Sequence, residues 1–368
     1  MQRPRDKPKL SSQLFSAIAP FLTIILPSVF ISPSAMAEKI TYAELKPGDV
    51  ITVSLDQLLP TQSVLAYDNE YSNLGRYAEN LKFMYDDLCR LNGAKGIEKW
   101  TEDSLPTDIA SYQCIDKPGE HIDDLSTVVV GPEKGVLYLT NNHHILSTFW
   151  DMPNGGTSVP VTLKVEYNLL ASGDDFWPEM LHDKAVWLYD SKGEKIKPKS
   201  LPGYLGTKQL KHDPFLSLVY FLKGISYETP KKTKKNKLNN EPSFLELYWS
   251  QILRQKMNIS EYDLNVPEQY AIALTEAATI MVDLDSDTII GKSNKTAKEM
   301  GQLSQVNARA LDALLTDSKS KWHYAMAYRL EKKEKSTPKS LLDDKKESAE
   351  ESAKEKDKTA PEEKEVKK

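Results

Sequence analysis

The sequence predicts an α+β fold, with strand-forming segments first and a helical half behind them. Short, alternating apolar runs bounded by Gly and Pro fill the first half of the chain, and longer runs with helical spacing fill residues 214–315. Strands and helices do not alternate regularly, so a doubly wound sheet is not expected. With 368 residues and 40% apolar content, the chain is long enough for one large domain with appendages.

The first half contains most of the strand signals. Alternation from Val50 to Leu55 predicts a strand, and Pro60 ends the turn that follows it. Apolar residues at helical spacing predict helix within residues 72–92. The same patterns then predict strands at 127–130, 135–140 and 159–169, a helix at 143–152, a hairpin around 191–193, and later helices at 214–224, 243–257, 267–282 and 297–315.

The N-terminus resembles a secretory signal peptide over residues 1–37. A basic start precedes an apolar run from 17 to 31, and Ala35 and Ala37 supply the small-x-small cleavage pattern. The run is shorter than the roughly 20 residues that a spanning helix needs. We therefore expect an exported protein, periplasmic or secreted, without a stable membrane span after cleavage; an uncleaved anchor is the alternative.

The cysteine count fits export. Cys89 and Cys114 are the two cysteines of the chain, and an even number in an exported protein predicts one disulfide. Two buried thiols are the alternative. The chain has no Cys/His cluster with zinc spacing, and residues 283–294 lack the Gly and Glu of a calcium loop, so no metal site is predicted.

Two charged segments are expected outside the core. Residues 231–237 hold five lysines and predict a solvated loop, with a nucleic-acid or phospholipid patch as the alternative. Residues 317–368 are expected to form a charged, disordered tail, because from Glu331 onward twelve lysines are balanced by twelve acidic residues without an aromatic one. A lone solvated helix is the alternative there. The net charge of −5 gives no chain-wide attraction to nucleic acid.

The adjacent histidines His143 and His144 lie at a predicted strand-to-helix turn. Asn141 or Asn142 can cap the helix, and the free N–H groups of a helix start suit an anion such as phosphate. Two imidazoles at that point can donate hydrogen bonds or transfer protons near neutral pH. The simpler interpretation is a helix cap with one core and one surface histidine.

The order of several blocks resembles the ParB-like nuclease family. The blocks are VSLDQLLPTQ (53–62), YLTNNHHILSTFW (138–150), VTLKVEYNL (161–169), DDFWPEM (174–180), LKHDPFLSLVYFL (210–222) and SFLELYWSQILR (243–254). The resemblance implies a mixed sheet of the ParB/sulfiredoxin type over residues 38–170 and a helical extension over 171–316. It also implies that the histidine turn forms a ligand pocket, with Thr61 and Gln62 facing it, although an ordinary turn at 60–62 is equally compatible with the sequence.

The family pattern is not kept in full. Its turn has Asp and Gly where this chain has Asn141 and Asn142, so a carboxylate that could act as base or metal ligand is absent. Asn tolerates a positive φ, so the turn itself can survive. In the later block Asp213 and Ser217 match, but Leu216 replaces an arginine suited to bidentate phosphate recognition.

Two functions follow from these residues. The first is an exported hydrolase that acts on phosphodiesters, in which His143 and His144 bind the phosphate and transfer protons while Asp213 orients one imidazole. The second is a non-catalytic module that keeps the pocket for nucleic acid, another phosphate-bearing ligand or a protein partner. A carboxylate within hydrogen-bond reach of either histidine would favour catalysis. Chromosome partitioning conflicts with export, and the sequence assigns neither a cofactor nor an oligomeric state.

Overall fold

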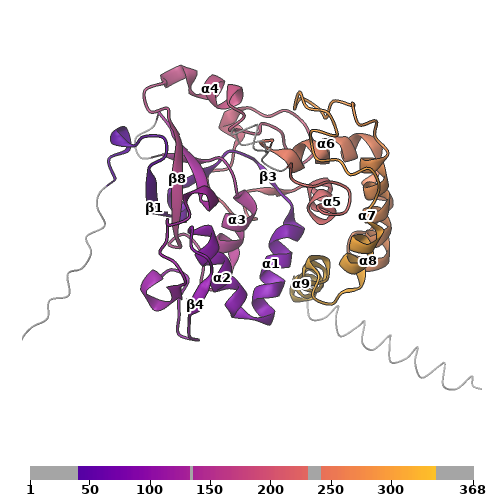
Figure 1. Cartoon of the computed structure of the whole chain (residues 1–368), viewed down its shortest axis with the longest axis horizontal. Coiled ribbons are helices and arrows are strands. Elements are labelled where there is room, and N and C mark those ends of the chain that lie inside the picture. The colour runs from indigo at the N-terminus through magenta and orange to yellow at the C-terminus, as the bar shows by residue number, and fades with distance from the viewer. Residues whose placement is uncertain (1–39, 133–135, 231–241, 337–368) are drawn as a thin grey trace, which may run out of the picture. The chain divides into compact units, whose positions relative to one another are not determined.

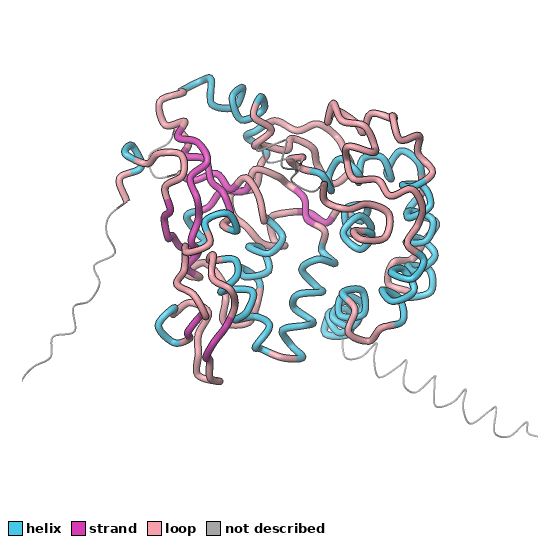
Figure 2. Tube along the Cα trace, in the orientation of Figure 1, coloured by secondary structure: helices cyan, strands magenta, loops and turns pink. Residues whose placement is uncertain are grey.

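The computed structural model describes residues 40–132, 136–230 and 242–336. From Thr41 onward the described residues belong to one compact unit. Its strands gather on one side and most of its helices on the other (Figure 1, Figure 2). The predicted α+β class is confirmed.

A mixed five-stranded sheet forms the first half, in the order β1-β8-β6-β7-β2. β8 runs parallel to β6 and antiparallel to β1, β7 is antiparallel to β6, and β2 is parallel to β7. The strands are β1 (Val50–Ser54), β2 (Leu58–Pro60), β6 (Ser126–Val130), β7 (Leu137–Leu139) and β8 (Pro160–Asn168). β6 and β7 are apolar and buried almost throughout, as expected for strands covered on both faces.

Parallel pairing brings three helix starts together. β2 and β7 end in register at Pro60 and Leu139, and the chain continues from them into α1 (Tyr67–Glu79) and α3 (His143–Asp151). The segment between β2 and α1 contains β3 (Val64–Leu65), which pairs in parallel with β9 (Lys211–His212). α5 (Pro214–Leu222) follows β9. The helices α1, α3 and α5 therefore begin close to the C-terminal ends of these strands. The first backbone N–H groups of each helix have no intrahelical partner.

The helical half packs around large apolar side chains. Phe221, Tyr227, Trp249 and Tyr270 are fully buried there. The remaining helices are α2 (Leu81–Leu91), α4 (Phe176–His182), α6 (Leu245–Lys256), α7 (Pro267–Val282), α8 (Ala308–Thr316) and α9 (Lys321–Ser336), and β4 (Ile97–Lys99) pairs with β5 (Gln113–Cys114). Short 3₁₀ turns cover Tyr42–Glu44, Leu55–Gln57, Ile109–Ser111, Ile122–Asp124, Gly173–Asp175, Pro198–Ser200 and Ile259–Glu261.

Two predicted helices differ from the structure. Asn80 interrupts the helix expected within 72–92, because it is extended and its side chain caps α2 at the Lys82 amide (2.9 Å). Residues 297–307 form turns, and α8 starts only where the Asn307 side chain caps it. The predicted hairpin around 191–193 is present and short: Tyr189 and Lys195 form an antiparallel bridge, and the Ile196 N–H donates to the Leu188 carbonyl (3.0 Å).

The C-terminal boundary also differs. We predicted an unstructured tail from residue 317, but α9 packs along α1 and buries Trp322 and Met326. At Gly75 the two helices approach so closely that a Cβ would lie 2.6 Å from the Tyr324 carbonyl oxygen. The prediction placed residues 317–330 in the tail because charged residues dominate the sequence from Glu331 onward, although the start of α9 is apolar. The predicted signal peptide, the lysine segment 231–237 and residues 337–368 lie outside the described residues.

Within the described ranges, no helix is long and apolar enough to cross a membrane.

Candidate functional site

His143, at the start of α3, bonds to the segment that follows β2. Its Nε2 atom accepts a hydrogen bond from the Thr61 backbone N–H (3.1 Å), and the Thr61 hydroxyl donates to the Leu139 carbonyl (2.6 Å). His143 and Thr61 are both buried. The side chain therefore connects the ends of the two parallel strands β2 and β7.

The start of α1 is capped by side chains from other elements. His144 Nε2 accepts from the Ala66 N–H (2.9 Å), and His212 Nδ1 accepts from the Tyr67 N–H (3.3 Å). The next amide, that of Asp68, reaches the Ser217 hydroxyl at 3.4 Å. Three donors at this helix start are thus satisfied from α3, β9 and α5, which fixes α1 against all three.

These contacts define the protonation state of the three histidines. A backbone N–H can only donate, so the ring nitrogen that it meets must be unprotonated. Burial lowers the pKa of His143 to about 3, with a smaller contribution from His144, and lowers the pKa of His144 to about 4 and that of His212 to about 4. All three rings are neutral acceptors near neutral pH. Within the described residues, no carboxylate hydrogen-bonds to His143 or His144.

The turn before α3 survives the loss of glycine. Asn142 has φ 57° and ψ 24°, so it takes the left-handed conformation that we expected an asparagine to tolerate. Its side chain does not cap α3 as predicted, because its amide donates to Ser126 Oγ (3.0 Å). Asn141 Oδ1 accepts from the Thr127 N–H (2.8 Å). Both asparagines are exposed, and no side chain caps the first turn of α3.

Other predicted site residues are used by the fold. Gln62 is buried and donates to the Val64 carbonyl (2.7 Å). Asp213 caps α5 through the N–H groups of residues 215 and 216, and its other oxygen accepts from Arg254 (2.6 Å). The structure thus pairs Asp213 with Arg254 instead of with either histidine of the pair. Burial still raises the pKa of Asp213 despite the opposing guanidinium.

Cys89 of α2 and Cys114 of β5 form a disulfide, as predicted. It joins α2 to the segment that leads to residues 116–121. Three backbone hydrogen bonds fix the same segment to residues 92–96: Ile115 to Gly96 (2.8 Å), Gly119 to Asn92 (2.7 Å) and His121 to Gly93 (2.9 Å). The segment is therefore held at both ends.

A cavity of about 710 Å³ lies between α1, α2, this segment and the first turn of α3, which contributes Ile145. Arg76, Arg90 and Lys95 supply positive charge, and Asp87 and Asp124 supply negative charge. The other lining residues are Asn73, Leu91, Ala94 and His121. The volume is typical of a small-molecule site.

Each cation of the cavity has a carboxylate partner. Arg76 pairs with Asp87, Arg90 pairs with Asp86 at 2.9 Å, and Lys95 pairs with Asp116 at 3.3 Å. The side chains of Arg90 and Lys95 are 62% and 64% exposed. Ion pairs this exposed contribute little stability, so both cations can exchange partners at low cost.

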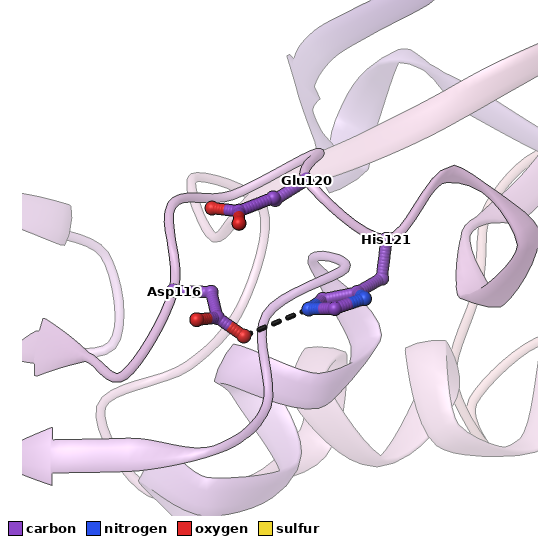
Figure 3. A group of neighbouring side chains, drawn as sticks. All are labelled: Asp116, Glu120 and His121. Carbon is purple, nitrogen blue, oxygen red and sulfur yellow. Dashed lines mark hydrogen bonds and ion pairs between the residues drawn. The ribbon is translucent and has the colours of Figure 1, made fainter.

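His121, on the wall formed by the disulfide-linked segment, is paired with a carboxylate. Its Nε2 atom lies 2.7 Å from Asp116 Oδ2, and Glu120 is close to both (Figure 3). The side-chain hydrogen bond from His121, followed by the contacts of Lys95, lowers the pKa of Asp116. Asp116 is therefore a carboxylate that can only accept, and His121 Nε2 is the donor.

Sequence reasoning missed His121, His212 and the cavity cations. His212 had a usable signal, since it directly precedes Asp213, which the family block already singled out. For His121 the signal was the predicted disulfide, because a bond between residues 89 and 114 brings the following loop beside α2.

Three comparisons with known proteins bear on this site. A family model described as "Putative ParB-like nuclease" matches residues 51–255. No curated protein matches the chain significantly. A solved structure, the crystal structure of protein Atu1540 from Agrobacterium tumefaciens, is 18% identical, with a TM-score of 0.42; the match covers 64% of this chain and 93% of that one.

Proposed function

The chain belongs to the ParB-like nuclease family, and we propose that it binds a phosphate-bearing ligand, a strand of nucleic acid, in the cavity beside the first turn of α3. In this proposal His143 and His144 position the backbone that surrounds the pocket and do not transfer protons. The observation that carries the ligand proposal is the set of cations Arg76, Arg90 and Lys95 that line the cavity. The positioning role rests on the use of both Nε2 atoms as acceptors for the backbone amides of Thr61 and Ala66.

A proton relay needs a nitrogen that is accessible and that titrates near the working pH. Nε2 of each histidine is occupied, and the lowered pKa values of about 3 and about 4 keep both rings neutral. The catalytic role that the sequence suggested for the pair therefore has less support than a positioning role. If the His143→Ala and His144→Ala variants lost activity while they remained folded, a catalytic role for the pair would again be supported.

The cations of the cavity support a phosphate-bearing ligand. Arg90 and Lys95 are exposed, and their carboxylate partners Asp86 and Asp116 can be exchanged for phosphate oxygens. Asn141 and Asn142 are exposed beside the uncapped start of α3, where an anion is favoured by free N–H groups. Thr61, Gln62, Asp213 and Ser217 would act indirectly, since each is buried and bonded within the fold.

We also propose that the protein is exported from the cytoplasm. The basic, apolar and small-residue pattern of the first 37 residues indicates a signal peptide. The disulfide is consistent with an oxidising compartment. The ligand would then be nucleic acid outside the cytoplasm.

Binding of labelled single-stranded and duplex DNA and RNA to the purified chain tests the proposal. We expect single strands to bind, with an affinity that falls as salt rises. The double variant Arg90→Gln plus Lys95→Gln should lower the slope of log affinity against log salt by about 1.4, since each phosphate contact contributes roughly 0.7 for single strands.

The matched control is Lys197→Gln plus Lys199→Gln, which removes the same charge from exposed positions that do not line the cavity. This control should leave the slope unchanged. Equal slopes for the two double variants, or no binding at low salt, would contradict the proposed function.

A further inference from the structure

We propose that His121 is the catalytic acid–base residue for phosphodiester hydrolysis in this cavity and that Asp116 positions its ring. The inference rests on the proposed function, because it requires a phosphodiester in the cavity. It departs from the histidine turn, which the family resemblance favoured, and assigns the reaction to a histidine that lines the cavity.

In the His121–Asp116 pair, the carboxylate holds the imidazole in one orientation, as a general base requires. His121 lines the cavity and Asp116 Oδ2 lies 2.7 Å from its Nε2 atom. Because Asp116 is a carboxylate, it holds the proton on Nε2 and leaves Nδ1 with the lone pair. An imidazole ordered in this way can accept a proton at Nδ1 while the carboxylate stabilises the imidazolium that forms.

The surrounding backbone keeps the pair in place. The disulfide fixes Cys114, and the hydrogen bonds of Gly119 to Asn92 and of His121 to Gly93 close the loop on both sides of Glu120. Asp116 also accepts from Lys95, which lines the same cavity. The disulfide and these backbone hydrogen bonds therefore hold the His121–Asp116 pair in place beside Lys95, as a catalytic group needs.

The chemical step is a hydrolysis by water. Nδ1 of neutral His121 takes a proton from a water molecule, and the water oxygen forms a bond to phosphorus. The bond from phosphorus to the leaving ester oxygen then breaks with its electron pair. The imidazolium returns its proton to that oxygen, so His121 ends as it began. Arg90 and Lys95 would neutralise the charge of the phosphate oxygens.

A divalent metal at the same residues is the competing interpretation. Asp116, Glu120 and His121 bring one donor atom each to within 4.8 Å of one another (Figure 3). In the structure, however, the Nε2 proton of His121 and the ammonium of Lys95 both occupy Asp116 Oδ2. A metal would have to displace both, so we favour the hydrogen-bonded pair.

The experiment measures cleavage and binding separately on the full chain with the single-stranded probe. His121→Asn should keep affinity within about twofold and lower the cleavage rate about 10²–10⁴-fold, the range for loss of a general base. His182→Asn is the matched control: His182 is also 2.8 Å from an aspartate, Asp183, but its side chain is 88% exposed and does not line the cavity. It should change neither quantity.

Asp116→Asn separates positioning from mere folding. It should lower the rate and move the acid limb of the pH–rate profile to lower pH, since the imidazolium loses its carboxylate. A purely structural role would reduce the amount of folded protein without moving that limb.

The outcomes distinguish this inference from the proposed function. Binding without cleavage by the unaltered chain, undiminished cleavage by His121→Asn, or cleavage abolished by EDTA and restored by a divalent metal would each overturn the inference and leave binding standing. Absence of binding would overturn the proposed function itself.

Discussion

The two histidine sites of this protein use the same side chain in opposite ways. His143 is buried and accepts from the Thr61 amide, whereas His121 is partly exposed and donates to the Asp116 carboxylate. A backbone amide donates its one hydrogen and never changes its charge, so a histidine that accepts from it has a structural role. A carboxylate can hold the ring in one orientation and stabilise an imidazolium formed during a reaction, so its partner can take part in proton transfer.

Burial and the hydrogen-bond partner, more than the sequence motif, decide what each of these histidines does. The pair at residues 143 and 144 is the more conspicuous motif, yet the Nε2 atom of each ring accepts from a backbone amide. The lone His121 lies in an irregular loop and faces a cavity with three cations. Unfolding measurements can test this difference, because substitutions at His143 should lower the free energy of unfolding and substitutions at His121 should not.

His143→Ala should have the largest effect. It leaves the buried Thr61 N–H without its acceptor and removes buried ring atoms, so we expect a loss of about 3 kcal/mol in the free energy of unfolding. His143→Gln, which can place an oxygen near the Nε2 position, should lose less. Urea unfolding measures both. His121→Ala should stay within about 0.5 kcal/mol, and an equal loss there would remove the distinction between the sites.

Acid should destabilise the protein through His143, which is buried, and through His144 and His212, which are partly buried. The pKa values of His143, His144 and His212 lie at about 3, 4 and 4 when folded, below the ordinary 6.5, so the unfolded chain takes up protons first. Their contribution is complete above about pH 6.5 and is lost as pH falls toward the folded values. The contribution of Glu70 to the pH dependence has the opposite sign. Burial, followed by the nearby Asp151, raises the pKa of Glu70 well above the ordinary value, so here the folded protein takes up the proton first.

Burial also raises the pKa of Asp87 and Asp213, which oppose the histidines in the same direction as Glu70. The net loss should therefore be at most about 2 kcal/mol between about pH 7 and pH 5.5. Urea unfolding at the two pH values measures it. His144→Gln keeps an acceptor for the Ala66 amide and cannot titrate, so it should make the pH dependence shallower. A dependence that the variant leaves unchanged would show that His144 titrates normally in the folded protein.

Thr61→Val tests the smaller part of the same contact. It removes the hydroxyl that donates to Leu139 (2.6 Å) but keeps the backbone N–H that binds His143. We expect a loss of about 1 kcal/mol in the free energy of unfolding, typical of one hydrogen bond. Thr61→Ser keeps the hydroxyl and should lose less. If Thr61→Val were as damaging as His143→Ala, the hydroxyl would be the essential partner.

Periodicity predicted most of the fold. The strands at 126–130 and 160–168 and the helices at 143–151, 245–256 and 267–282 follow their apolar patterns, because local spacing determines which face each element buries. The site was harder to predict. The His143–Thr61 and His144–Ala66 contacts join residues 82 and 78 positions apart, so the parallel pairing of β2 and β7 had to be known first.

The same limit explains the missed cavity. Its cations come from α1, α2 and the loop after α2, and no short window of sequence brings all three together. Net charge was also uninformative, since each cation has a carboxylate neighbour. The start of α9 was missed because the lysine and glutamate run dominates the composition around it.

Asp116→Asn should have the smallest effect on stability, and for that reason it is the sharpest test of the second site. Its partners His121 and Lys95 are side chains near solvent, and ion pairs of this kind contribute little to folding. The urea midpoint should not change measurably, even though we expect the cleavage rate to fall. A clear drop in the midpoint would mean that Asp116 holds the loop at residues 115–121 in place, and both histidine sites would then serve structure.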